Sequence, residues 1–157
     1  MGTGFSFTCS RCKKTYSANW GIGTDFPLEY ARTLKAVKEG KYGEEWQKLY
    51  EENDHAAIDA VQYVYMCKRC GNWSEEQGLA LYVPRNAGRS ESGRDPEACV
   101  YSFDLKTDYR LLRQYIHRCK KCNGVMRRAE DSELENLCCP VCGGAPVEPG
   151  SLKTLGM

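Results

Sequence analysis

Apolar and polar residues alternate at the start of the chain. Phe5 and Phe7 alternate with small polar residues and lead directly into Cys9, as a strand that carries a metal-binding turn would. The segment 61–66 is rich in β-branched and aromatic residues and ends at Cys67 in the same way. Further short strands are predicted at 13–17, 79–83 and 125–128.

Helical spacing replaces this alternation in the next part of the chain. Apolar residues recur every three positions from Leu28 to Val37, and Gly40 follows as a helix end. A second helix is predicted over 44–52, with Trp46 on its apolar side. Together they predict a helical hairpin inserted at about residues 25–60. A third, short helix is predicted at 108–115.

Four Cys-x-x-Cys pairs carry the main chemical signal. They are Cys9/Cys12, Cys67/Cys70, Cys119/Cys122 and Cys139/Cys142. Two thiolates on one tight turn can bind a tetrahedral metal ion from one side, so four pairs predict two metal sites. Only sixteen residues separate the last two pairs, a spacing typical of one compact zinc site. By elimination, the first two pairs are expected to share the other ion.

This pairing predicts a small, metal-stabilised α+β fold of two zinc ribbons, the first with the inserted helical hairpin. The predicted first ribbon spans 1–84. A polar segment at 85–98, without large apolar residues before Cys99, predicts a flexible linker. The predicted second ribbon, with its preceding short helix, spans 99–150, and 151–157 is expected to be a loose tail.

Composition argues against a membrane protein and favours metal binding by the cysteines. The chain of 157 residues is 41% hydrophobic and 27% charged, without an apolar run that would span a bilayer. It begins without the pattern of a secretory signal, so we expect a cytoplasmic protein with no membrane partner. Thiols stay reduced there, which favours metal binding over disulfides for the ten cysteines.

The segment Cys119–Gly144, which ends in Cys-Pro-x-Cys-Gly, resembles the zinc-ribbon and rubredoxin-like group of small metal proteins. The layout is also similar to bacterial proteins with paired zinc ribbons. This resemblance implies two Zn²⁺ ions, with iron as the alternative. Rubredoxins usually carry glycine after both cysteine pairs, and Lys13 and Asn123 here favour zinc.

One stretch concentrates positive charge in a chain whose formal net charge is only +1. Between residues 110 and 128 there are seven basic residues and no acid. Rings at Tyr109, Tyr115 and His117 could stack on unpaired bases. The candidate nucleic-acid contacts are Arg110, Arg113, Arg118, Arg127 and Arg128. Lys120 and Lys121 are expected to balance the charge of the metal site.

No motif for catalysis stands out. The chain has two histidines, His55 and His117, without the spacing of a metalloprotease or deaminase. The roles of Cys99 and Cys138 are left open. We therefore expect a zinc-binding, non-enzymatic binding or adaptor protein that contacts nucleic acid or another protein. The alternatives are a protein–protein interaction module without nucleic acid and a rubredoxin-like electron carrier with iron.

Overall fold

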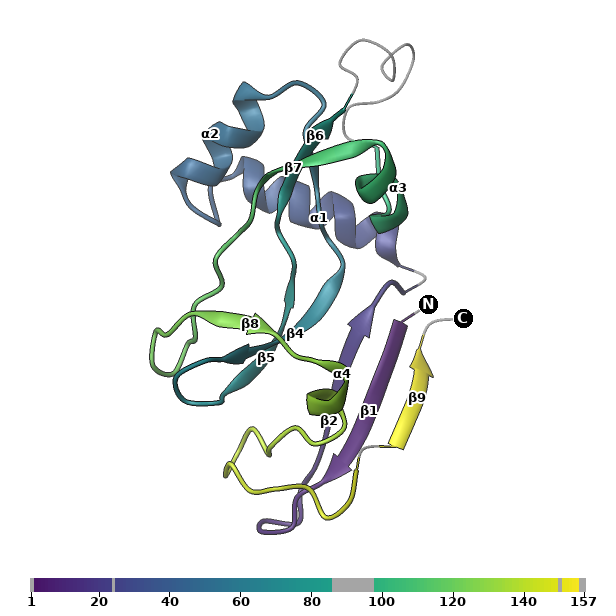
Figure 1. Ribbon diagram of the computed structural model, residues 1–157, viewed down its shortest axis with the longest axis vertical. Coiled ribbons are helices and arrows are strands. Elements are labelled where there is room, and N and C mark those ends of the chain that lie inside the picture. The colour runs from purple at the N-terminus through teal and green to yellow at the C-terminus, as the bar shows by residue number, and fades with distance from the viewer. Residues whose placement is uncertain (1, 24, 86–97, 150, 156–157) are drawn as a thin grey trace. The chain divides into compact units, whose positions relative to one another are not determined.

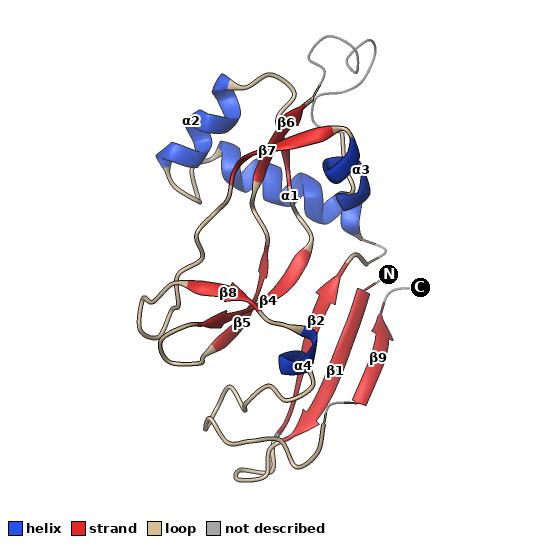
Figure 2. Ribbon diagram, viewed as in Figure 1, coloured by secondary structure: helices blue, strands red, loops and turns tan. Residues whose placement is uncertain are grey.

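The computed structural model describes residues 2–23, 25–85, 98–149 and 151–155. The chain divides into two compact units, and each is discontinuous in sequence. Unit 1 contains residues 1–24, 62–76 and 116–157, and unit 2 contains 25–61 and 77–115. Helices and antiparallel strands occur together in the described parts (Figures 1 and 2). The expected small α+β fold is confirmed.

Unit 1 is built on one antiparallel sheet, in which the described strands run in the order β5-β4-β2-β1-β9 and β8 pairs with β4. Its elements are β1 (Gly2–Thr8), β2 (Thr15–Gly21), β4 (Gln62–Cys67), β5 (Trp73–Gln77), β8 (Met126–Arg128), α4 (Asp131–Leu134) and β9 (Ser151–Leu155). The β1–β2 pair keeps one continuous register from Gly2↔Gly21 to Thr8↔Thr15. The turn between these two strands contains the first cysteine pair.

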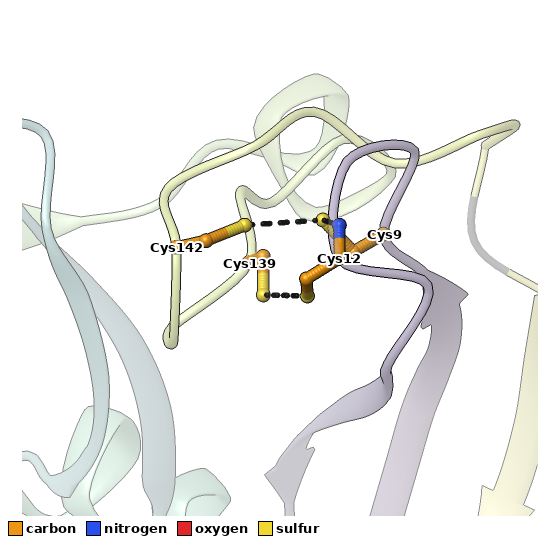
Figure 3. A group of neighbouring side chains, drawn as sticks. All are labelled: Cys9, Cys12, Cys139 and Cys142. Atoms are coloured by element: carbon orange, nitrogen blue, oxygen red, sulfur yellow. Dashed lines mark hydrogen bonds between the residues drawn. The ribbon is translucent and has the colours of Figure 1, made fainter.

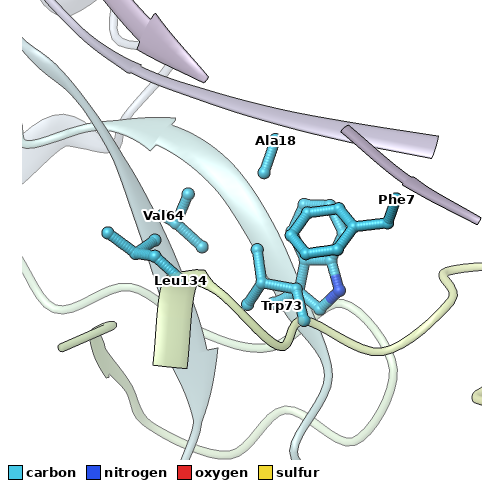
Figure 4. Close-up of a cluster of buried hydrophobic side chains, with 6 residues drawn as sticks. Phe7, Ala18, Val64, Trp73 and Leu134 are labelled. Carbon is cyan, nitrogen blue, oxygen red and sulfur yellow. The ribbon is translucent and has the colours of Figure 1, made fainter. Parts of the chain in front are cut away.

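Alternating apolar residues of these strands form the core of unit 1. The buried cluster comprises Phe7, Ala18, Val64, Trp73, Leu134 and Leu137, and Figure 4 shows five of them with labels, converging from the sheet and α4. Phe7 stacks on Tyr16 with ring centroids 5.0 Å apart. The indole N–H of Trp73 donates a 2.7 Å hydrogen bond to the carbonyl of Cys138, so the segment after α4 is tied to the sheet.

Unit 2 combines helices with a smaller sheet of order β3-β6-β7. Its elements are α1 (Phe26–Lys38), α2 (Glu44–Glu52), β3 (Ala57–Ile58), β6 (Leu81–Pro84), α3 (Ser102–Thr107) and β7 (Tyr109–Arg113). The two helices expected within about 25–60 are present as α1 and α2. Tyr30, Ile58 and Leu81 are fully buried, and the indole N–H of Trp46 donates to the carbonyl of Leu79 at 2.9 Å.

The prediction of a helix at 108–115 is wrong. The helix of this region is α3, which ends at Thr107, and residues 109–113 form strand β7. Pairing with β6 explains the difference, because Val83 lies opposite Arg110 and Pro84 opposite Tyr109. A tertiary partner thus overrides the local helical pattern.

The prediction of a loose tail at 151–157 is also wrong over residues 151–155. Residues 151–155 form β9, which pairs antiparallel with β1 from Ser6↔Ser151 to Gly2↔Leu155. The unpaired N–H and C=O groups along the outer side of β1 provide the partner that the local sequence does not reveal. Residues 156–157 lie outside the described residues.

The division into successive ribbons at 1–84 and 99–150 does not match the two units. Unit 1 gathers residues from both predicted ribbons, and the two inserted segments 25–61 and 77–115 join to form unit 2. Within the linker predicted at 85–98, residues 86–97 lie outside the described residues. Among the helices that the structure describes, none is long and apolar enough to cross a membrane.

Candidate metal centres

The four Cys-x-x-Cys turns share one backbone design. We number them turn 1 to turn 4 in chain order. In each, the residue after the second cysteine has a left-handed backbone, with φ of 63° at Lys13, 77° at Gly71, 62° at Asn123 and 76° at Gly143. The N–H of that residue donates to the carbonyl of the first cysteine at 2.8–3.2 Å. This conformation lets further N–H groups point at the first sulfur, as in Cys12 N–H to Cys9 Sγ at 3.4 Å.

Site A joins turn 1 to turn 4. It consists of Cys9, Cys12, Cys139 and Cys142, whose sulfurs all lie within 4.8 Å of one another. Figure 3 shows the four side chains pointing toward a common centre. The sulfurs of Cys9 and Cys142 are 3.4 Å apart, and those of Cys12 and Cys139 are 3.7 Å apart. A tetrahedral ion with metal–sulfur bonds of about 2.3 Å places its sulfurs about 3.8 Å apart. The group therefore has the size of a tetrathiolate metal site.

Site B joins turn 2 to turn 3 in the same way. It consists of Cys67, Cys70, Cys119 and Cys122, again within 4.8 Å of one another. The closest sulfurs across the two turns are 3.3 Å apart for Cys67 and Cys122, and 3.7 Å for Cys70 and Cys119. The side chain of Asn72 adds a hydrogen bond to the sulfur of Cys119 at 3.7 Å. All ten cysteines are free of disulfides, so all eight thiols of the two groups could hold metal.

These groups correct the predicted pairing of turn 1 with turn 2 and of turn 3 with turn 4. Strand pairing explains why. β4 pairs with β8 through Cys67↔Met126, which brings turn 2 beside turn 3. An isolated bridge, Cys9↔Pro146, brings turn 1 beside turn 4. The true arrangement is nested, with site B between the two halves of site A in the sequence.

The two sites are built alike, residue by residue. In site A the N–H of Ser10 donates to the carbonyl of Ala145 at 2.9 Å, and in site B the N–H of Lys68 donates to Val125 at 3.1 Å. Each donor follows the first cysteine of its turn, and each acceptor lies six residues after the first cysteine of the opposite turn. Unit 1 thus contains the same metal-binding arrangement twice.

A glycine at one position fits each pair of turns together. A Cβ added at Gly144 would lie 3.0 Å from the sulfur of Cys9, and one at Gly124 would lie 3.1 Å from that of Cys67. Lys14 occupies the equivalent position of turn 1. Each site therefore combines one turn with this glycine and one without it. Turns 3 and 4 both have the glycine, and in the structure each of them pairs with a turn that lacks it.

The metal-free thiols of each site differ in acidity. The N–H of Cys12 is the main cause that lowers the pKa of Cys9 to about 6, against the effect of burial. The N–H of Lys14 also lowers the pKa of Cys12, but burial and hydrogen bonds with neighbouring thiols raise it to about 11. In site B the N–H of Cys122 is the main cause that lowers the pKa of Cys119 to about 6. The N–H of Gly124 lowers the pKa of Cys122, but the hydrogen bond with the thiol of Cys67 and burial raise it to about 11. Each group thus offers thiolate to a metal ion at neutral pH and must also lose protons to bind it.

The five arginines proposed for nucleic-acid contact are divided between the units. Arg110 and Arg113 lie on β7 in unit 2, whereas Arg118, Arg127 and Arg128 lie in unit 1. Three of them already have intramolecular contacts. Arg113 forms an ion pair with Glu45, Arg127 donates to both carboxylate oxygens of Glu133 at 2.6 and 2.7 Å, and Arg128 lies 3.7 Å above the ring of Tyr63.

The rings expected to stack on bases are occupied by packing. Tyr109 is buried, and Tyr115 packs edge-on against Trp46 with centroids 5.1 Å apart. His117 is buried against Tyr65, with ring centroids 4.0 Å apart. Cys138 packs against the core cluster of unit 1, and burial raises the pKa of its thiol. These contacts favour structural roles for His117 and Cys138.

No model of a known protein family matches this chain, and neither a curated protein nor a solved structure matches it. The similarity to zinc ribbons therefore rests on the two tetrathiolate groups themselves.

Proposed function

We propose that the protein is a zinc-binding, non-enzymatic binding module in which two structural Zn²⁺ ions hold unit 1 in its fold. The observation that carries this proposal is the presence of two groups of four thiols with sulfurs at the separations of a tetrahedral site. Four thiolates fill a tetrahedral shell and leave no position open for substrate or water. A structural role of both ions follows from this closed ligand set.

Burial and position support a structural role. The first cysteine of every turn is buried, with exposed fractions of 0–5%. The ligands come from three separate stretches of sequence, so the ions join segments that the chain itself connects only through long insertions. Structural zinc contributes on the order of 10 kcal/mol to small metal-binding domains. Among the described residues, the larger buried cluster of unit 1 has six members, and the smaller one has four, of which Cys67 and Cys119 are themselves ligands of site B. The contribution of zinc is large beside cores of this size.

Metal analysis of the purified protein tests the proposal directly. We expect about two zinc ions per chain, since two groups of four thiols are present. Replacement by cobalt should give the intense absorption of tetrahedral cobalt thiolates, and stepwise titration should reach its end point at two equivalents. A protein that retains its fold after complete metal removal would contradict the structural role.

Iron is the alternative occupant, because a tetrathiolate group also suits it. The N–H groups that point at the first sulfur of each turn would then tune a redox potential. A red protein with reversible one-electron reduction after native expression would replace the adaptor proposal with electron transfer. A colourless protein containing zinc would support the adaptor proposal.

A further inference from the structure

Sites A and B share a backbone but differ at the two residues between the cysteines of each turn. In site B all four of these positions are basic, and in site A only one is. They are Lys68, Arg69, Lys120 and Lys121 in site B, and Ser10, Arg11, Pro140 and Val141 in site A. Site A has the same geometry with one cation at these positions, and its other two cations, Lys13 and Lys14, follow the second cysteine of turn 1. Cations between the cysteines are therefore not required by the metal-binding arrangement.

The charges around each site also indicate that the cations of site B are not needed only to balance the metal. Four thiolates and one divalent ion leave a charge of about −2 at each site. In site A, Arg11 donates to the carbonyl of Cys142 at 3.5 Å and Lys13 donates to the carbonyl of Ser10 at 2.8 Å, so two of its cations fold back onto the turns. In site B, only Lys120 has an acidic partner in the described structure, Glu76 at 3.6 Å. The side chain of Lys120 is 84% exposed, so this ion pair is weak.

The cations of site B form one surface although they come from distant parts of the sequence. The N–H of Lys68 bonds to the carbonyl of Val125, and Arg118 forms an isolated bridge with the same residue. The Cβ of Arg69 lies 3.2 Å from the Cβ position of Gly124. We define the basic tip as these neighbouring exposed side chains: Lys68, Arg69, Arg118, Lys120 and Lys121.

The acids of unit 1 lie mainly elsewhere. Unit 1 has eleven Lys and Arg against seven Asp and Glu, and four of the acids fall within residues 130–135. Eight thiolates and two divalent ions would bring the formal charge of the unit close to zero. The positive field is therefore local to the basic tip and does not reflect an overall positive charge.

We propose that the basic tip binds the phosphate backbone of nucleic acid without reading its sequence. The inference rests on the proposed function, because a metal ion in site B would hold the two turns together. The positions between the cysteines present cations and no apolar side chain of the kind that anchors protein partners. The tyrosines expected to stack on bases are buried or packed, so phosphate contact is the recognition that remains.

Two charge-matched variants test the proposal in the full-length, zinc-loaded protein. The tip variant carries Lys68→Gln, Arg69→Gln and Lys121→Gln. The control variant carries Arg11→Gln, Lys13→Gln and Lys14→Gln, which removes the same charge from site A. Binding of a short fluorescent DNA, as single strand and as duplex, is followed by anisotropy over a range of salt concentrations.

We expect the tip variant to bind about tenfold more weakly or worse at low salt, and the control variant to bind nearly as tightly as the unmodified protein. Each lost phosphate contact lowers the salt-dependence slope by about 0.9 for duplex DNA, so the tip variant should lose roughly 2 to 3 units of slope. Comparison of the two DNA forms shows whether the basic tip prefers the phosphate backbone of single-stranded or of duplex DNA. Zinc content is measured on the same samples and should be unchanged.

Three results would overturn the proposal: no DNA binding by the unmodified protein, equal weakening in both variants, or stronger competition by polyglutamate or anionic vesicles than by nucleic acid. Equal weakening would mean diffuse electrostatic attraction, and stronger competition would indicate an acidic protein or a membrane surface. If the unmodified protein contains both zinc ions but does not bind DNA, only the proposal for the basic tip is refuted, and the proposed structural role of zinc is unaffected. Absence of zinc in the unmodified protein refutes the proposed function separately.

Discussion

Substitution of Gly144 by alanine probes the fit between turn 1 and turn 4. The added methyl carbon would lie 3.0 Å from the sulfur of Cys9, 3.0 Å from the Cβ of Arg11 and 3.3 Å from the sulfur of Cys142. Ordinary carbon contacts are about 3.5–4.0 Å. Both sulfurs would be fixed by the metal ion, so they cannot move aside without lengthening a metal–sulfur bond. The clash must be relieved by separating the two turns.

Overpacking of this kind costs about 1–3 kcal/mol. Because each 1.4 kcal/mol is a tenfold change, the zinc affinity of site A should fall about 5- to 150-fold. Site B should keep its affinity, since the three atoms nearest to the added methyl all belong to turns 1 and 4. The reciprocal change, Gly124→Ala, places its methyl 3.1 Å from Cys67 Sγ and should weaken site B alone.

Zinc release to a chromophoric chelator measures the two affinities, and hydrogen exchange of the amides in each turn shows which site has opened. Gly23→Ala is the matched control, because a Cβ there meets no atom within 4 Å and the backbone is not left-handed. It should leave both sites unchanged. Equal loss of zinc from both sites in Gly144→Ala, or opening of turn 3 in place of turn 1, would refute the reasoning.

Two further predictions follow from the ligand sets and their acidity. Replacing Cys119 by serine should reduce zinc from about two ions to about one and loosen the turn at Cys67; hydrogen exchange that shows the turn at Cys67 still protected would argue against the nested pairing. At pH 7 the metal-free thiols of Cys9 and Cys119, with pKa near 6, are already ionised, whereas Cys12 and Cys122, with pKa near 11, are protonated. Each zinc ion should therefore release fewer than four protons, as measured by calorimetry in buffers of different ionisation enthalpy, and release of four would be inconsistent with these pKa values.

The local pattern of the sequence is sufficient to identify the eight thiols and the strands that lead into turns 1 and 2. The alternation of Phe5 and Phe7 before Cys9, and the β-branched run before Cys67, depend only on neighbouring residues, and both strands are present. The inserted helices at 26–38 and 44–52 are predicted for the same reason. Spacing within each pair, which sets the shape of a turn, is also local.

The partner of each turn is decided by tertiary structure. Sixteen residues separate turns 3 and 4, and 126 separate turns 1 and 4. The longer loop is about three doublings of the shorter one, so closing it costs only roughly 2 kcal/mol more in chain entropy. Strand pairing through β4 with β8 and β1 with β9 outweighs it, as does the close fit of Gly124 and Gly144 against the opposite turns.

The same distinction explains the segment from residue 108 to the C-terminus. Residues 109–113 contain apolar and basic residues that suit a helix locally, but β6 provides a strand partner far away in sequence. Residues 151–155 have no strong strand pattern of their own and are ordered by the outer side of β1. Short-range periodicity thus determines which residues can form strands and bind metal. Contacts between distant segments determine which strands pair and which cysteines share an ion, because the free energy of those contacts exceeds the local preferences.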